Sequence, residues 1–419
     1  MINDLSIQAV KNSRFGTFQK PLYDSYCFSR IPATIQKMFG MTSSDTLPDD
    51  VVGTKEYDFI IFFLLDGFGW NLFEKHCDRF PFLQRFIQNG RVNALTSMFP
   101  STTTCHITCL HTGLTAGYTG LYEWYTYEPT AQATIIPMRF SFATDRKINT
   151  LKDAGISPSE IFPFPSFYDS LKQSGIKSYV FQPKDITNSP YSNTLQNSAV
   201  NIGYKTLHEG LNKLRRTFNE TTAEKAYFFF YYPEIDSYSH AHGPHSKQTE
   251  KELIHTFNQL EHFFQTVPKT KKNSVCIVGA DHGLTYIEPK QKLFLNKLIP
   301  EIEPLLALSP KGTAIVPCGS SRDFFLHIKP ECLQQAKTLI QNALSGIAEV
   351  YETKELIDKG LFGPISERFL KRVGNLVILP YTPGTVWWYD ERLPQTEYLG
   401  HHGGLSADEL EIPFLVLEL

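Results

Sequence analysis

Cysteine is scarce and unpaired in this sequence, which has seven cysteines among its 419 residues and no two of them in a CxxC spacing. An odd and scattered set argues against a disulfide framework and against a zinc site built from thiolates. The cysteines are therefore predicted to be small buried hydrophobic residues of a protein in a reducing compartment.

An excess of one charge is also missing. Lys and Arg total 40 against 43 Asp and Glu, which gives a formal net charge of -3. This balance argues against stable nucleic-acid binding and against attachment to a membrane surface. Any recognition of phosphate must be local.

Long hydrophobic runs are absent as well. The longest apolar stretches, 59–65 and 226–232, are too short to span a bilayer. Residues 1–20 show no basic segment followed by an apolar run and a cleavage site. We expect a cytoplasmic protein without a membrane span, although export without a cleavable signal would leave no such trace. The sequence does not reveal the oligomeric state.

The residues that are plentiful describe a globular chain. Hydrophobic residues make up 42% of it, including 32 Phe and 20 Tyr. Its length permits two or three domains without requiring them.

Three apolar runs each end in a cluster of polar residues: FIIFFLLDGFG (59–69), AYFFFYYPEIDSYSHAHGP (226–244) and SVCIVGADHG (274–283). Continuous apolar strands fit a sheet that is buried on both faces, which is usually parallel and covered by helices. Helical spacing of apolar residues occurs over 70–89, 166–174, 207–219 and 247–266. This alternation predicts an α/β sandwich with a mostly parallel central sheet.

Residues 288–399 interrupt the alternation with several Pro and Gly, a strand-like SSRDFFLHI and a short helix near 330–345. We predict that they form an inserted cap subdomain. The core is then residues 1–287 plus 400–419, because the chain returns to it with GHHGG and the apolar strand IPFLVLEL.

Acidic and histidine side chains collect at the predicted strand ends, where the loops of an α/β fold carry function. Three carboxylates with three or four imidazoles and no thiolate could hold two transition-metal ions, and they fit Zn or Mn better than Mg or Ca. Each signal is weak alone, because an Asp-Gly pair is usually a turn. The candidates are Asp66, Asp236 and His240 four apart in a loop, Asp281, His282, His401 and His402.

The segment MFPSTTTCHITCLHTGL (98–114) runs from a Pro turn through consecutive hydroxyl residues into a stretch compatible with a helix. A Thr hydroxyl at a helix N-terminus would meet backbone amides and a dipole that favour an alkoxide or a phosphoryl oxygen. The alternative reading of Ser101 to Thr104 is a plain N-cap run.

Taken together and in order, these segments resemble the type I phosphodiesterase and nucleotide pyrophosphatase family of the alkaline phosphatase superfamily. The segments are the strand-end DG, FPSTTTCHITCLHTG, EIDSYSHAHGP, ADHGL and GHHGG. The resemblance implies an alkaline-phosphatase-like three-layer α/β/α sandwich with Thr103 as nucleophile. It also implies that Asp66, Thr103, Asp281 and His282 bind one metal, and that Asp236, His240 and His402 bind the other. His402 is preferred over His401 because it directly precedes Gly403.

The resemblance further implies hydrolysis of a phosphoester or pyrophosphate bond through a covalent phosphothreonine, with two divalent ions, Zn or Mn. The expected substrate is a small-molecule phosphoester such as a nucleotide or a related diester. A phosphomonoesterase of the same superfamily and a catalytically silent homologue that binds a phospho-ligand remain alternatives.

The substrate contacts depart from the family pattern. Glu123 and Trp124 stand near the position of a family Asn that holds a phosphate oxygen, so both are candidate substrate contacts. Arg322 is a third candidate, because a guanidinium suits phosphate. The alternatives are a Glu in a structural network and an Arg paired with Asp323 or another acid.

Overall fold

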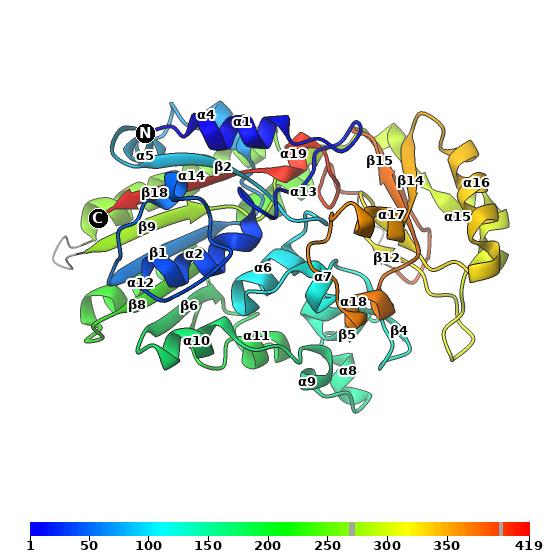
Figure 1. Cartoon of the computed structure of the whole chain (residues 1–419), viewed down its shortest axis with the longest axis horizontal. Coiled ribbons are helices and arrows are strands. Elements are labelled where there is room, and N and C mark those ends of the chain that lie inside the picture. The colour runs from blue at the N-terminus through cyan, green and yellow to red at the C-terminus, as the bar shows by residue number, and fades with distance from the viewer. Residues whose placement is uncertain (268–272, 394–396) are drawn as a thin grey trace.

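The computed structural model describes residues 1–267, 273–393 and 397–419. Its main element is a seven-stranded sheet (Figure 1). In spatial order the strands are β2 (Arg91–Thr96), β18 (Glu411–Glu418), β9 (Ser274–Gly279), β1 (Phe59–Leu65), β8 (Ala226–Tyr232), β6 (Lys177–Pro183) and β7 (Val200–Tyr204).

The sheet is mostly parallel, as the apolar runs predicted. β1 pairs in parallel with β8 and β9, and β6 pairs in parallel with β7 and β8. β18 is antiparallel to both of its neighbours, β2 and β9. All seven residues of β1 are buried, which requires a covering layer on each face of the sheet.

One face of the sheet is covered by α12 (Leu207–Glu220) and α14 (Lys247–Thr266). Phe59 and Phe63, four residues apart on β1, both point to this face because side chains alternate along a strand. Their rings contact Phe218 of α12 and Phe263 of α14 with centroid separations of 5.9 and 5.7 Å. Helices α4 (Trp70–His76) and α5 (Pro81–Asn89) contact β18, and α5 also contacts α14.

The other face is covered by α6 (Thr103–Thr112), with α2 (Ile31–Met38) and α10 (Phe167–Gln173) beside it. Phe229 of β8 pairs with Phe62 of β1 and lies 5.5 Å, ring to ring, from His111 of α6. The result is the three-layer α/β/α sandwich that was predicted. α1 (Asp4–Asn12) and α3 (Asp49–Val52) lie along β2.

The helix predictions are confirmed with one correction. Helices α10, α12 and α14 occupy the predicted positions. The single helix expected over 70–89 is instead α4 and α5, because Pro81 begins a new helix. Proline lacks an N–H and suits the first position of a helix rather than its interior.

Residues between Leu295 and Trp388 build a second hydrophobic cluster, on the right in Figure 1. This part of the chain contains an antiparallel sheet and the predicted short helix, α16 (Leu333–Ala343). In spatial order the strands of the sheet are β12 (Cys318–Gly319), β13 (Phe324–Leu326), β15 (Leu376–Pro380) and β14 (Ala348–Glu352). Other residues of the segment, including Phe325 and Val377, belong to the main core. The boundaries of the cap subdomain therefore stay a prediction.

The remaining strands form small sheets. β3 (Thr126–Glu128), β4 (Ala133–Ile136) and β5 (Ser141–Phe142) form one small sheet, and β11 (Lys292–Phe294) pairs with β16 (Thr385–Trp387). β10 (Thr285–Tyr286) pairs with β17 (Gly400–His401). This last pairing brings the segment around residue 402 back beside the end of β9. Throughout the described ranges, no helix combines the length and the apolar character needed to cross a bilayer.

Candidate metal and nucleophile site

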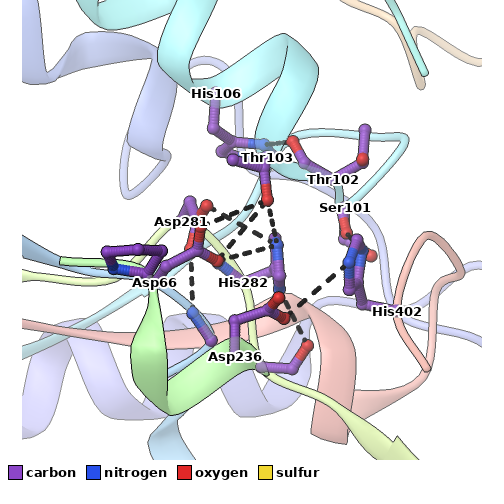
Figure 2. A network of polar contacts seen from close by, with 12 residues as sticks. Asp66, Ser101, Thr102, Thr103, His106, Asp236, Asp281, His282 and His402 are labelled. Atoms are coloured by element: carbon purple, nitrogen blue, oxygen red, sulfur yellow. Dashed lines mark hydrogen bonds and ion pairs between the residues drawn. The ribbon is translucent and has the colours of Figure 1, made fainter. Parts of the chain in front are cut away.

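The candidate residues meet at the carboxyl ends of three neighbouring strands. Asp66 follows β1 directly, and Asp281 and His282 lie just beyond the end of β9. Asp236 follows β8 on α13 (Glu234–His242). Parallel strands bring such ends to one edge of the sheet, and Figure 2 shows the carboxylates of Asp66, Asp236 and Asp281 gathered there.

Thr103 is the first residue of α6, as the hydroxyl run predicted. Its Oγ1 lies 3.4 Å from each carboxylate oxygen of Asp66 and 3.1 Å from Nε2 of His282. The preceding residue, Thr102, is the N-cap but makes no capping hydrogen bond with its side chain. The distances from Oγ1 to Asp66 and His282 show that the Thr103 hydroxyl points into the cluster of acids and imidazoles (Figure 2).

Asp236 and His240 lie on a helix, and the expectation that they lie in a loop is wrong. α13 begins directly after Pro233 and ends at Gly243, which has a φ of +88°. Residues four apart share one face of a helix, so the two side chains meet with 3.4 Å between Oδ1 of Asp236 and Nε2 of His240. Nε2 of His402 lies 3.9 Å from the same oxygen.

The hydrogen bonds of three histidines fix which nitrogen carries the proton. Nδ1 lies 2.8 Å from the Gly400 carbonyl in His240, 3.1 Å from the Gly283 carbonyl in His282 and 3.0 Å from the Ser101 carbonyl in His402. A carbonyl can only accept, so each Nδ1 must carry the hydrogen. Each Nε2 then keeps its lone pair and faces the carboxylates, which is the arrangement of a histidine metal ligand.

Two carboxylate oxygens of the site lack hydrogen-bond partners among the described residues. Oδ1 of Asp281 accepts hydrogen bonds from the backbone N–H groups of Gly67 and His282. Oδ2 of Asp281 and Oδ1 of Asp236 are buried, and no donor from the described part of the chain reaches either of them. Buried oxygens without donors are costly, and a cation at this position would satisfy them. The donor set therefore fits divalent transition metals, with oxygen and nitrogen ligands and no thiolate.

Burial shapes the charge of the cluster. It holds the pKa of Asp66 well above its usual value, with Asp281 and Asp236 adding to the effect. It also lowers the pKa of His282 to about 4 and that of His402 well below its ordinary value. The imidazoles are therefore neutral near pH 7, the form in which histidine binds a metal.

Among the residues that the structure describes, two groups of side chains have ligand atoms close enough to share one ion. They are Asp236, His240 and His402, and Asp66, Asp236 and His282. The first set is the one that the resemblance implied for one metal. Asp236 belongs to both sets, whereas the resemblance placed it in one.

Sequence reasoning missed Tyr231, whose hydroxyl donates a 2.5 Å hydrogen bond to Oδ2 of Asp66. It lies in the apolar run of β8, where a tyrosine reads as a core residue. His401 lies beside the site, but its Nδ1 is hydrogen bonded to Ser321 at 2.9 Å. Among the described residues it belongs to neither ligand group.

Comparison with known proteins identifies the family of this chain. The family model described as type I phosphodiesterase / nucleotide pyrophosphatase matches residues 60–405, a span that includes Asp66, Thr103 and His402. The chain belongs to this family. Family members hydrolyse phosphoester bonds, and the chain is a phosphoester hydrolase of the alkaline phosphatase superfamily and of a metal-dependent family. None of the curated protein sequences matches the chain.

Solved structures share the fold of this phosphodiesterase-family chain. Murine ectonucleotide pyrophosphatase/phosphodiesterase 5 is 17% identical with a TM-score of 0.63, and the match covers 85% of this chain and 87% of the murine one. An inactive variant of that murine protein has been solved in complex with AMP, with the same identity, TM-score and coverage. Phosphonoacetate hydrolase from Sinorhizobium meliloti, in complex with phosphonoformate, is 16% identical with a TM-score of 0.60 and coverage of 85% and 89%.

Arg322 does not contact the phosphodiesterase-family site, and the expectation that it binds a substrate phosphate is wrong. Its Nε and Nη2 donate to the two oxygens of Glu409 at 3.0 and 2.8 Å. The remaining N–H groups donate to the carbonyls of Tyr381 and Gly384 and to Oγ1 of Thr382. All five donors of the guanidinium are used inside the protein, and both ion-pair side chains are fully buried.

Arg322 is expected to matter for stability instead. Arg322→Met leaves Glu409 buried without its partner and should lower the free energy of unfolding by about 3–5 kcal/mol. The control is Arg216→Met, which removes an exposed pair with Glu220 and should cost less than about 1 kcal/mol. Urea unfolding of both variants measures the difference. If Arg322→Met is as stable as the wild type but binds a phosphate substrate more weakly, Arg322 contacts the substrate after all.

Glu123 is fully buried, as are the proposed metal ligands Asp281 and His282, so its contact with substrate stays a prediction. The carboxylate accepts the backbone N–H of Trp124 and lies among Thr102, Ser320 and Asp323. Trp124 is 39% exposed, and its contact with substrate stays a prediction. The sequence could not separate these neighbours, because only the fold shows that one side chain turns inward and the other outward.

The stability of the protein should depend on pH through Glu123. Burial raises the pKa of this carboxyl from 4.5 to about 7, so the folded chain binds more protons than the unfolded chain between these values. Stability is therefore lost as pH rises through this window, by something on the order of 3 kcal/mol. Glu123→Gln cannot ionise and so does not lose this stability. The free energy of unfolding of the variant, measured with urea, should therefore rise relative to that of the wild type between pH 5 and pH 8. Parallel stability curves would contradict the assignment.

Proposed function

We propose that the chain is a metal-dependent phosphodiesterase or nucleotide pyrophosphatase that uses Thr103 as its nucleophile. The observation that carries the proposal is the Thr103 hydroxyl within 3.4 Å of Asp66 and His282, beside imidazoles whose Nε2 atoms face the carboxylates with the lone pair that a metal would take. Such a set of oxygen and nitrogen donors suits two Zn or Mn ions.

The proposed holders come from the two ligand groups and from the family resemblance. Asp236, His240 and His402 would hold one ion, and Asp66 and His282 the other, with Asp236 in reach of both. The resemblance adds Asp281 and Thr103 to the second ion. Bound there, the ions would favour the alkoxide of Thr103 and offset the charge of the phosphoryl oxygens.

The chain's own residues then define the reaction. Oγ1 of Thr103 forms a bond to phosphorus while the bond from phosphorus to the leaving oxygen breaks, giving a phosphothreonine, and the proton of the Thr103 hydroxyl ends on the leaving oxygen. Water then attacks phosphorus and the bond to Oγ1 breaks. One proton of the water goes to Oγ1 and restores the Thr103 hydroxyl, while the oxygen of the water stays on phosphorus. The hydrogen bond from Tyr231 holds the Asp66 carboxylate in its orientation throughout.

A nucleotide or a related diester is the proposed substrate. The AMP bound to the murine relative supports this class. The half-exposed ring of Trp124 offers a flat surface for a base, since aromatic side chains stack on one another and on bases.

The test is a turnover screen of the full chain after addition of Zn or Mn, over matched aryl phosphate mono- and diesters, dinucleotides and sugar nucleotides. We expect diesters or pyrophosphates to be hydrolysed fastest, with about two metal ions bound per chain. Faster turnover of monoesters would make the protein a phosphomonoesterase. Failure to take up metal and to hydrolyse any substrate would make it a silent binding protein.

A further inference from the structure

His106 lies on α6, three residues after Thr103, and its ring is fully buried. Nδ1 is 2.7 Å from the carbonyl oxygen of Thr102, and the backbone N–H of Met98 donates to Nε2 at 2.8 Å. Figure 2 shows the ring beside the Thr102–Thr103 turn, away from the carboxylates. The imidazole therefore joins the end of the β2 segment to the turn that carries the nucleophile.

Two partners of the ring are backbone groups, and these two fix its protonation. The Thr102 carbonyl can only accept and the Met98 amide can only donate, so the hydrogen is on Nδ1 and Nε2 is a neutral acceptor. Burial lowers the pKa of His106 to about 4, in keeping with this form. The ring packs edge to face on Phe28 at 4.6 Å, so its orientation is held by packing as well.

The carbonyl that His106 binds belongs to the peptide that enters Thr103. The same oxygen accepts the backbone N–H of His106 at 3.3 Å, so two donors from one residue fix its direction. The peptide is planar, and its N–H points opposite to its C=O. Fixing the Thr102 carbonyl therefore fixes the N–H of Thr103 and the position from which its Cα and Oγ1 extend.

A second connection runs to a predicted metal ligand. Oγ of Ser97 lies 2.7 Å from Nε2 of His106 and 2.7 Å from the carbonyl oxygen of Asp281, and its one hydroxyl hydrogen can be donated to either of these acceptors. One ring thus contacts the backbone before Thr103 on one side and, through Ser97, the backbone of Asp281 on the other. Movement of the ring would change the distance between nucleophile and ligands.

We infer that His106 is a positioning residue that sets Oγ1 of Thr103 against Asp66 and His282 by holding the Thr102–Thr103 peptide. The inference rests on the proposed function, since it assigns a role within that reaction. His106 touches none of the reacting atoms. It affects kcat by fixing the position of Oγ1 of Thr103. Misplacement of a reacting group by about 1 Å can lower the rate about 10²-fold.

The same helix supplies a matched control. His111 is also fully buried, with Nδ1 2.8 Å from the Tyr168 hydroxyl and Nε2 2.9 Å from the Gln196 amide. It lies eight residues after Thr103, on the part of α6 that packs on Phe229. Loss of either imidazole should cost stability, but only His106 holds the nucleophile turn.

The experiment compares His106→Gln and His111→Gln by kcat and KM for an aryl phosphodiester, bound metal and melting temperature. The Gln amide lies near the former Nε2 and leaves the Thr102 carbonyl without its donor from the ring, so we expect kcat of His106→Gln to fall about 10²-fold, with KM and metal content close to wild type. His111→Gln should melt at a similarly reduced temperature and keep kcat within a few-fold. His106→Asn, whose amide nitrogen takes the place of Nδ1 and can donate to Thr102, should recover activity relative to His106→Gln. Equal kcat in the two Gln variants would overturn the inference.

A measurement on the wild type keeps the inference testable if the His106 variants do not fold, or if no phosphoester proves to be a substrate. In protein labelled with nitrogen-15 histidine, the His106 ring should carry a slowly exchanging proton on Nδ1, which faces the Thr102 carbonyl, and no proton on Nε2, which faces the Met98 amide. A proton on Nε2 would overturn the inference. An inactive wild type with the Nδ1 proton in place would instead refute the proposed function and leave the hydrogen-bonded turn established.

Discussion

Thr103→Ala is expected to lower kcat by at least about 10³-fold, while the protein keeps its fold and its bound metal. The substitution removes the hydroxyl that lies 3.1 Å from Nε2 of His282 and 3.4 Å from both oxygens of Asp66. The acidic and histidine side chains proposed to bind metal remain in the variant. Asp66 also keeps its orientation, because the hydrogen bond from Tyr231 is unchanged. Turnover of an aryl phosphodiester and metal content after dialysis measure the two effects.

The control for this variant is the next residue. Thr104 is buried and its Oγ1 has no hydrogen-bond partner within the described part of the chain, so Thr104→Val should preserve turnover. Thr103→Ser keeps a hydroxyl and should retain measurable activity. Turnover of Thr103→Ala at the rate of Thr104→Val would show that another group attacks phosphorus.

Asp236→Asn is expected to weaken metal binding at two positions at once. Asp236 is shared by both groups of ligand atoms, whereas His240 belongs to one of them. We expect affinity at both positions to fall by about 10²-fold or more and turnover to be lost at ordinary metal concentrations. His240→Ala should weaken a single position, so titration with Zn should show one weakened site in His240→Ala and two in Asp236→Asn.

Glu252→Gln is the matched control for Asp236→Asn, because Glu252 is another buried acid with its own partners, the hydroxyls of Tyr232 and Thr256. It should bind metal like the wild type. If Asp236→Asn also weakens only one site, Asp236 serves one ion, as the family resemblance implies.

The sequence was most informative where a local pattern decides the structure. The continuous apolar runs predicted β1, β8 and β9 because strands buried on both faces need no polar face. Asp66 and Asp281 could be placed at one edge because they follow parallel strands. Helix α14 was predicted at its observed bounds, since its apolar spacing ends before Pro268.

The sequence was least informative where distant partners decide. Arg322 looked available for phosphate because Glu409 lies 87 residues away in the chain, and no local signal pairs them. The role of His106 depends on backbone groups of Met98 and Thr102, which have no sequence signature. The short run of α13 contains few strong helix formers, so its helix could not be told from a loop.

The position of β18 has a consequence for how the molecule is built. This strand lies between β2 and β9 and comes after His402 in the chain, so within the described residues β2 joins the sheet through the strand that is synthesised after the other six. Until residues 411–418 leave the ribosome, β2 and β9 each expose an unpaired edge, and one metal group lacks His402. An emerging chain can therefore neither close its sheet nor assemble its full set of metal ligands. Activity should consequently appear together with completion of the sheet rather than in steps.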